Sequence, residues 1–221
     1  MHAPARFSLP GISGWQPFTK GPHSELFRAP TSKPILAKVI RPRSQPRDTL
    51  RKYVNAQARR EWRSAFRLQD AGLEAPRVHG WAVSISPFAP YESILFMEEI
   101  EGFKTSLRFI RESENAADRR LFFDDLAADM ARLHGHGLIH KDGHFGNIGW
   151  GSGDQLIWID NDIRFANTPA KLEKGFLHMR QMLERTARND VHAEEWRYFD
   201  QRLRMQLERW PKARALGATL R

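Results

Sequence analysis

The sequence contains no cysteine, which excludes disulfide bonds and metal sites built on thiolates. No apolar run approaches the roughly 20 residues that a membrane-spanning helix requires. The first residues, 1–6, also lack the apolar stretch of a secretory signal. We therefore expect a cytoplasmic protein that does not cross a bilayer.

Acidic residues are also in deficit. The 221 residues include 26 Asp and Glu against 35 Lys and Arg, which gives a net charge of +9. This excess predicts anionic partners such as nucleotide phosphates, phosphorylated sugars, acidic lipid head groups or nucleic acid, without choosing among them. The sequence shows neither zinc-finger spacing nor an aromatic RNA-binding pattern, so nucleic acid is the disfavoured partner. The length is sufficient for one large domain or two small lobes.

The chemistry is concentrated in the pattern His140-x-Asp142-x-x-x-x-Asn147, which Asp160 follows thirteen residues later. Phosphoryl transfer from ATP needs a carboxylate at the incoming hydroxyl and oxygen ligands that hold Mg²⁺ on the phosphates. Asp142 fits the catalytic base, while Asn147 and Asp160 fit the metal ligands. The alternative, in which these residues only build a turn after a helix, is disfavoured because a helix precedes the pattern and a strand follows it.

The chain begins with an irregular lead-in, residues 1–14, and continues with three short strands expected at 15–19, 25–29 and 35–40. Pro17 indicates that the first strand lies at a sheet edge. The turn between the first two strands contains Gly21 and Ser24. Its backbone N–H groups could cradle phosphates, but a plain hairpin turn would have the same sequence, and both interpretations stay open.

Lys38 lies within the apolar third strand, where its ammonium group must reach solvent or find a partner. Glu61, on a helix expected from about 48 to 71, is the predicted counter-ion, and Lys38 would then bind the α- and β-phosphates of ATP. The alternatives are a Lys38 that points to water and a Glu61 that pairs with a neighbour on the helix surface. The nine basic residues from Arg41 to Arg67 otherwise read as a solvated face, or as a surface that meets an acidic membrane.

Further strands are expected near 81–85 and 93–98, followed by a polar connector. Backbone groups around Glu98 and Ile100 could meet an adenine edge, with Met97 beside it, although a methionine there is also compatible with plain core packing.

The strongest helical pattern spans 116–135. Its apolar stripe consists of Leu121, Phe122, Leu126, Met130 and Leu133, and its three aspartates, Asp124, Asp125 and Asp129, are expected on a solvated face. Two more helices are predicted at about 170–188 and 193–209, and a hairpin turn at 149–153. The tail from Pro211 onward is expected to be frayed or loosely docked.

The ordered set Lys38, Glu61, His140-x-Asp142-x-x-x-x-Asn147 and Asp160 resembles the protein-kinase-like fold over about residues 15–209. Asp160-Asn161-Asp162 stands where eukaryotic protein kinases have Asp-Phe-Gly, no Ala-Pro-Glu segment follows, and the Gly-rich loop is reduced to Gly21. Within the superfamily, three stretches resemble the bacterial lipopolysaccharide core kinases of the heptose and Kdo type. They are Arg60-Glu61-Trp62-Arg63 ahead of Ala71-Gly72-Leu73, Leu133-His134-x-x-Gly137-Leu138-Ile139-His140, and Ile159-Asp160-Asn161-Asp162.

This resemblance implies an α+β fold with two lobes, a small β-rich lobe at residues 15–100 and a mainly helical lobe at 101–210, followed by a tail at 211–221. It implies transfer of phosphate from ATP, with Mg²⁺, to a sugar hydroxyl of the lipopolysaccharide core on the cytoplasmic face of the inner membrane. His140 would brace the catalytic loop. The spelling Asp142-x-His144-x-x-Asn147 is shared with aminoglycoside and choline phosphotransferases, so a small-molecule kinase, a protein kinase and a non-catalytic anion-binding protein remain alternatives.

Overall fold

The computed structural model describes residues 14–21, 23–41, 52–86, 89, 91–151 and 155–220. By its internal contacts the chain divides into two compact units. Unit 1 comprises Met1–Trp62 and Arg77–Glu99, and unit 2 comprises Arg63–Pro76 and Ile100–Arg221. No helix of the described part is long and apolar enough to cross a membrane.

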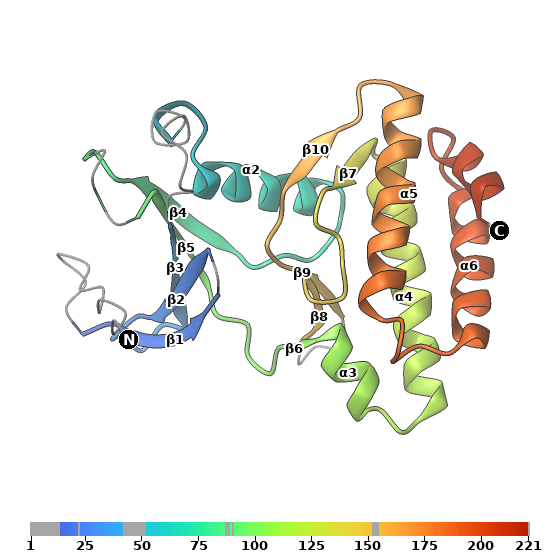
Figure 1. Cartoon of the computed structure of the whole chain (residues 1–221), viewed down its shortest axis with the longest axis horizontal. Helices are drawn as coiled ribbons and strands as arrows, with labels where there is room; N and C mark the ends of the chain where they lie inside the picture. The colour runs from blue at the N-terminus through green and yellow to red at the C-terminus, as the bar shows by residue number, and fades with distance from the viewer. Residues whose placement is uncertain are drawn as a thin grey trace, which may run out of the picture. The chain divides into compact units, whose positions relative to one another are not determined.

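Unit 1 is built on a five-stranded antiparallel sheet with the order β1-β2-β3-β5-β4 (Figure 1). Its strands are β1 (Gln16–Lys20), β2 (Ser24–Arg28), β3 (Ile35–Ile40), β4 (Val78–Val83) and β5 (Ser93–Glu98). The predicted edge position of Pro17 is confirmed, and the β1–β2 register shifts between Pro17 and Thr19. At an edge, the missing N–H of a proline costs no ladder hydrogen bond.

Helix α2 (Gln57–Asp70) follows β3 and contributes to both units, since the division falls between Trp62 and Arg63. Residues 52–55 form a separate helical turn, and Ala56 interrupts it from α2, so the single helix expected from 48 to 71 is shorter at its start. Residues 42–51, which carry part of the predicted basic face, lie outside the described residues. Within the described part, Lys52 is buried rather than solvated.

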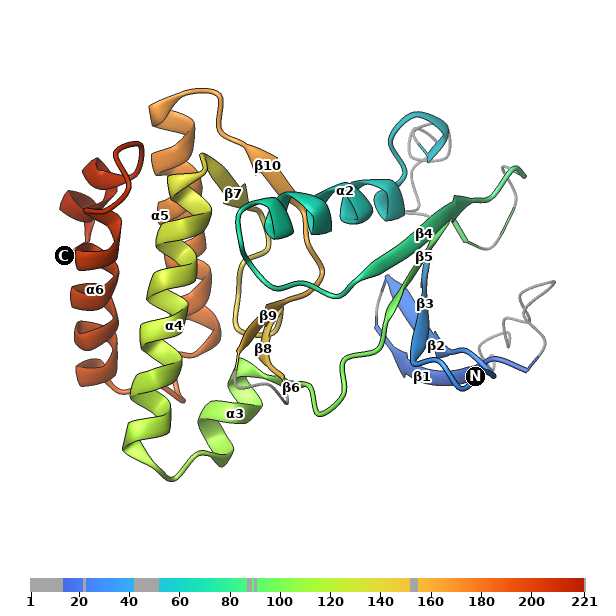
Figure 2. The ribbon, with the colours of Figure 1, turned by 180° about the vertical axis from the view of Figure 1, so that it is seen from behind.

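Unit 2 contains four α-helices and a 3₁₀ helix in its described part: α3 (Ser106–Glu112), α4 (Ala116–Gly135), α5 (Pro169–Thr186), α6 (Ala193–Leu207) and η1 (Arg214–Thr219). The predicted bounds of α4 are confirmed. Asn115 caps this helix, since its side chain accepts a hydrogen bond from the N–H of Ala117. Helices α4 and α6 lie side by side (Figure 2). Helix α3 was not expected from the sequence.

Short strands of unit 2 form two small sheets. One has the order β6-β8-β9, from β6 (Lys104–Thr105), β8 (Ile148–Trp150) and β9 (Leu156–Trp158), and the other pairs β7 (Leu138–His140) with β10 (Ile163–Phe165). The predicted hairpin after Ile148 is confirmed as the antiparallel β8–β9 pair. These strands hold the loops that carry the predicted catalytic residues.

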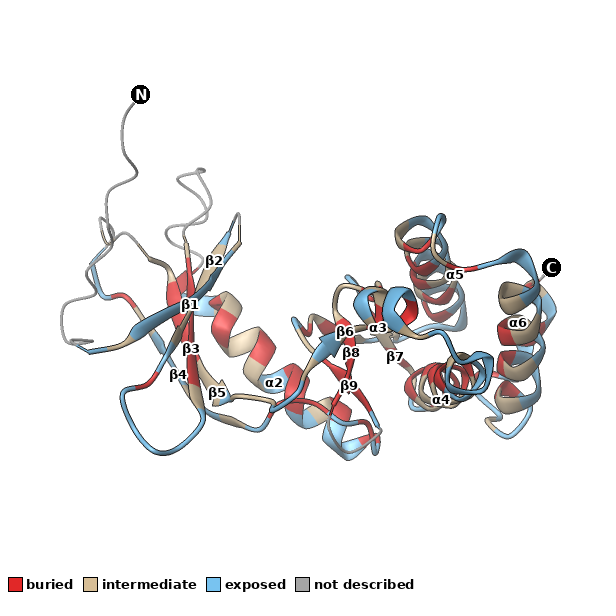
Figure 3. Ribbon diagram, turned by 90° about the horizontal axis from the view of Figure 1, so that it is seen from below, coloured by how far each residue is buried: buried red, intermediate tan, exposed pale blue. Residues whose placement is uncertain are grey.

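The main core of unit 2 lies around α4, whose buried residues extend over much of its circumference (Figure 3). Phe122, Leu126 and Met130 are buried as predicted, but Leu121 is exposed. Phe66, expected in the apolar stripe of α2, is also exposed, whereas Leu68 is buried. Helix α4 packs against α6, β7 and β9, so contacts on several sides decide which of its residues are buried.

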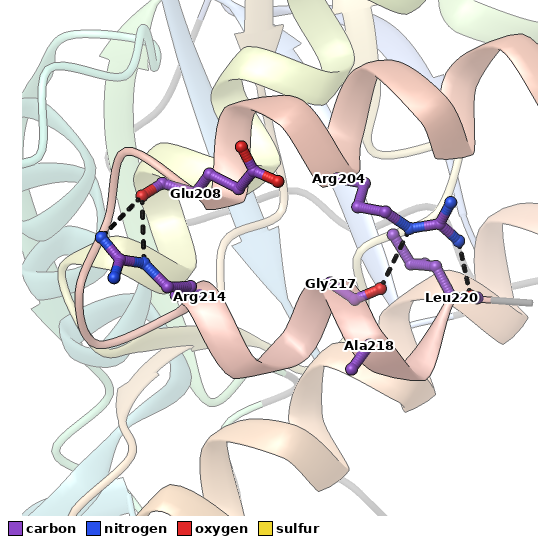
Figure 4. A pocket seen from close by; sticks show the side chains of 6 residues that line it. All are labelled: Arg204, Glu208, Arg214, Gly217, Ala218 and Leu220. Carbon is purple, nitrogen blue, oxygen red and sulfur yellow. Dashed lines mark hydrogen bonds between the residues drawn. The ribbon is translucent and has the colours of Figure 1, made fainter.

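The expectation of a frayed tail is wrong, because the chain after Pro211 is packed on unit 2. Leu216 and Leu220 are buried in its core. Arg204 of α6 donates to the carbonyl groups of Gly217 (3.2 Å) and Leu220 (2.6 Å), and Arg214 donates to that of Glu208 (Figure 4). These residues, with Ala218, line a cavity of about 730 Å³ that contains none of the predicted site residues.

The docked tail makes a testable prediction at Gly135. A Cβ atom there would lie 2.3 Å from Cδ2 of Trp210, so Gly135→Ala should lower the free energy of unfolding by about 1–3 kcal/mol through overpacking. In a Trp210→Ala background the same substitution should be neutral or slightly stabilising, because alanine is the better helix former. Equal losses in both backgrounds, measured by denaturant unfolding, would show that Trp210 does not pack there.

Candidate active site

Lys38 and Glu61 form a buried ion pair within unit 1. Lys38 lies on β3 and Glu61 on the first turns of α2, and Nζ of Lys38 is 2.8 Å from Oε2 of Glu61. The second carboxylate oxygen of Glu61 accepts a hydrogen bond from Nε2 of Gln57 (3.0 Å). The predicted pairing is confirmed, and the alternative of a solvent-facing Lys38 is wrong. Removing one partner of such a pair typically costs about 3–5 kcal/mol, because the other charge stays buried.

In unit 2, His140 is the buried centre of the catalytic-loop region. It ends β7, where it pairs with Ile163 of β10. Its Nε2 lies 3.2 Å from Oδ1 of Asn161, and its Nδ1 accepts a hydrogen bond from the backbone N–H of Asp142 (3.2 Å). Nδ2 of Asn161 donates in turn to the carbonyl of Trp158 (2.9 Å).

These contacts fix the protonation of His140. Because Nδ1 accepts from an N–H and Nε2 faces an amide oxygen, the ring must be neutral with its proton on Nε2. Burial disfavours the charged imidazolium and lowers the pKa of His140 to about 4. His140 is therefore a neutral hydrogen-bonding link between the loop that begins at Asp142 and the turn that contains Asn161, which matches its predicted role as a brace.

The loop after His140 is held by helix α5. Phe145 is fully buried in the core of unit 2 and its N–H faces Oγ1 of Thr186. A Cβ atom on Gly143 would lie 2.9 Å from Cγ of Met179, so only glycine fits at this point of the loop without displacing α5. The unusual residue after Asp142 thus has a packing reason, and Asp142 itself is exposed.

Asn147 and Asp160 are brought together by the β8–β9 hairpin. Ile148 pairs with Trp158, and the N–H of Ile159 donates to the carbonyl of Asn147 (2.9 Å). Asn147 and Asp160 therefore emerge at the same end of the hairpin. Nδ2 of Asn147 donates to the carbonyl of Asp142 (2.9 Å), which directs the amide oxygen to serve as a ligand and ties it to the loop of Asp142.

Asp160 adopts a left-handed backbone conformation with φ of 53°, and it is the one non-glycine residue with positive φ in the described part of the chain. Such conformations cost free energy in residues with a side chain and concentrate at functional sites. The exposed carboxylate of Asp160, with the amide oxygen of Asn147, supplies the hard oxygen ligands that Mg²⁺ prefers. In the described residues, no group of three or more His, Asp or Glu side chains is placed to hold a metal, so phosphate oxygens and water would have to complete the coordination.

Asp129 of α4 contradicts the prediction of a solvated acidic face. Its side chain is largely buried and accepts a hydrogen bond from the indole N–H of Trp158 (2.9 Å). Burial raises the pKa of Asp129 to about 6, against the opposing influence of that hydrogen bond and of Arg132. Trp158 also packs against the ring of His140, with 5.7 Å between ring centroids. The periodicity of α4 gave no signal for this contact, because it depends on where β9 packs.

The remaining predicted residues lie at two places in the fold. The N–H of Gly21 donates to the carbonyl of Ser24 (2.8 Å), as in a plain hairpin turn. The N–H of Glu98 donates to the carbonyl of Arg77 (2.8 Å), and Met97 packs beside the small core cluster of Ile40, Ala58 and Leu95. Phosphate binding at Gly21 and Ser24 and adenine contact by Met97, Glu98 and Ile100 stay predictions, and the Glu98 N–H is already engaged.

A model of the lipopolysaccharide kinase (Kdo/WaaP) family matches residues 43–200 of the chain. The chain belongs to this family. It is therefore a kinase that acts in lipopolysaccharide synthesis, and the matched residues include Glu61, His140, Asp142, Asn147 and Asp160.

Solved structures support the same fold. One described as WaaP in complex with acyl carrier protein is 17% identical, covers 93% of this chain and 85% of its own, and has a TM-score of 0.62. The bifunctional kinase-methyltransferase WbdD is 13% identical, covers 90% of this chain and 43% of its own, and has a TM-score of 0.51. At these identities the likeness establishes the kinase-like α+β fold alone. No curated protein sequence matches the chain significantly.

The buried carboxyl group of Asp129 predicts a pH-dependent stability. Because its pKa is raised in the folded state, folding becomes less favourable as the pH rises from about 4 to about 6, where the unfolded chain ionises first. Asp129→Asn keeps an acceptor for Trp158 and removes this cost. It should raise the free energy of unfolding by up to about 3 kcal/mol at pH 7.5 and by much less at pH 4.5.

The matched control is Asp118→Asn, at an exposed aspartate in the first turn of the same helix. It should be slightly destabilising at pH 7.5, because a negative charge favours a helix N-terminus. Denaturant unfolding at the two pH values measures both variants. An Asp129→Asn variant that is less stable than wild type at pH 7.5 would mean that the ionised carboxylate is required in the fold.

Proposed function

We propose that the chain transfers the γ-phosphoryl group of ATP, with Mg²⁺, to a heptose or Kdo hydroxyl of the lipopolysaccharide core. Family membership supports a kinase of lipopolysaccharide. The observation that carries the chemistry is the joined geometry of the catalytic loop and the β8–β9 hairpin, where the Asn147 amide bonds to the Asp142 carbonyl and emerges beside Asp160.

In this proposal the residues divide the work of phosphoryl transfer. The Asp142 carboxylate accepts the proton of the acceptor hydroxyl, which improves the oxygen as a nucleophile. Asn147 and Asp160 would hold Mg²⁺, which neutralises charge on the transferring phosphates. Lys38, kept in place by Glu61, would bind the α- and β-phosphates. His140 contacts no reactant and positions Asp142 through the backbone N–H of that residue.

The acceptor is proposed to be an anionic, lipid-linked sugar on the inner face of the inner membrane. The net charge of +9 supports it, because positive charge attracts an anionic substrate and raises its rate of encounter. A cationic acceptor such as an aminoglycoside would be repelled by the same field. ATP turnover measured with delipidated core sugars, aminoglycosides, choline and a generic protein tests this proposal. Turnover with a cationic small molecule and not with core sugars would contradict it.

The metal-binding role of Asp160 makes the next prediction. Asp160→Ala should lower kcat at least 100-fold, about 2.7 kcal/mol in the barrier, while the fold stays intact because the side chain is exposed. Asp190→Ala removes a carboxylate whose partner is Arg111 on the surface, and it should leave kcat near the wild-type value. Steady-state kinetics at saturating Mg²⁺ and ATP measure both. Retention of more than a tenth of wild-type kcat by Asp160→Ala would remove Asp160 from the metal site.

A further inference from the structure

Unit 1 carries an exposed group of large apolar side chains away from the predicted site residues. Ile85 is 89% exposed, Val54 74%, Tyr53 47% and Trp81 37%. Tyr53 and Val54 belong to the helical turn before α2, Trp81 lies on the edge strand β4, and Ile85 follows that strand. Monomeric proteins seldom expose several large apolar side chains at one place without a binding role. We call these four residues the apolar tip.

Hydrogen bonds show that the two segments of the apolar tip lie together. The hydroxyl of Tyr53 donates to the carbonyl of Ile85. The ammonium of Lys52 donates to the carbonyl of Ser86 (2.6 Å) and faces the hydroxyl of Ser84 (3.4 Å). Because Lys52 is buried among these groups, it fixes residues 52–54 against residues 84–86. The exposed side chains of Val54 and Ile85 are thus presented by a structured part of unit 1.

Positive charge surrounds the apolar tip. The guanidinium of Arg59 lies 5.8 Å from the ring centroid of Trp81 and donates to the carbonyl of Val54 (3.0 Å), while the ammonium of Lys52 lies 5.1 Å from the ring centroid of Tyr53. Residues 52–60 and 77–86 contain no aspartate or glutamate. The next acid, Glu61, is buried with Lys38, and the carboxylate of Glu92 accepts from the N–H of Gln57.

We propose that the apolar tip is a membrane-docking surface that binds the head groups and outer acyl region of a bilayer containing anionic lipid. Such a bilayer offers an apolar layer beneath negative head groups, which matches exposed aliphatic and aromatic side chains edged by arginine and lysine. Tyr and Trp are the aromatic residues enriched at membrane interfaces. A second copy of the chain would place the same positive charges against each other, so a bilayer is the better complement.

The docking surface deepens the proposed function, because a lipid-linked acceptor is confined to the membrane. It rests on unit 1 alone, however, and is tested without nucleotide or acceptor. A chain that binds vesicles but phosphorylates no core sugar would support the docking surface and contradict the proposed acceptor. The reverse result would overturn only the docking surface.

The experiment is vesicle flotation of the full chain. Vesicles of phosphatidylethanolamine with phosphatidylglycerol should carry the wild-type protein, vesicles of phosphatidylcholine alone should not, and added salt should weaken binding because exposed charge is screened. Val54→Ser with Ile85→Ser should reduce partitioning to the anionic vesicles by about tenfold or more, since it removes the two most exposed apolar side chains. Arg59→Gln should weaken binding to anionic vesicles and reduce its dependence on salt.

The matched control is Leu121→Ser with Met205→Ser, which replaces two apolar residues of unit 2 that are 50% and 52% exposed. It should float like wild type, and thermal unfolding should show that both double variants are folded. Equal flotation of the two double variants would overturn the proposal, as would failure of the wild type to bind anionic vesicles. Loss of self-association, and not of flotation, in the Val54→Ser and Ile85→Ser variant would assign the surface to a second copy and would also overturn it.

Discussion

The candidate active site depends on one buried, neutral imidazole. His140 receives the N–H of Asp142 on one side of its ring and faces the amide of Asn161 on the other. A protonated ring could not accept from that N–H, and burial makes protonation costly. The conformation of the catalytic loop is therefore linked to the turn that carries Asp160, and each supports the other through His140.

The buried polar groups of unit 2 differ in how well they are satisfied. His140 uses both ring nitrogens, whereas His134, six residues earlier, donates Nδ1–H to the carbonyl of Met130 and leaves Nε2 buried without a hydrogen-bond partner in the structure. Burial lowers the pKa of His134 to about 4 as well. Both histidines lose stabilisation as the pH falls from about 6.5 toward 4, because the unfolded chain takes up their protons first. Asp129 acts in the opposite sense, so the catalytic loop lies among groups whose effects partly offset.

The sequence predicted those parts of the site that local pattern determines. The spacing of His140, Asp142 and Asn147, and the isolation of Lys38 in an apolar strand, led to the correct loop and to the ion pair with Glu61. Helix α4 was predicted to the residue, since its period and its Asn115 cap agree.

The failures share a cause, which is packing between segments distant in sequence. Asp129 is buried because β9 places Trp158 against it, and Leu121 is exposed although it fits the apolar period of α4. The tail was expected to be loose because nothing in residues 211–221 announces that Arg204 of α6 binds its carbonyl groups. Asn161 was noticed only as a departure from Asp-Phe-Gly, and its contact with His140 requires the β7–β10 pairing.

The most direct test of this account is the protonation state of His140, observed by long-range ¹H–¹⁵N NMR correlation of the ring nitrogens, with a His140→Gln variant to assign the signals. The account predicts a neutral ring protonated at Nε2, unchanged between pH 8 and about 5.5, because burial holds the pKa of His140 near 4. A ring that titrates near its ordinary value of about 6.5, or one protonated at Nδ1, would contradict the link between the Asp142 loop and the Asp160 turn.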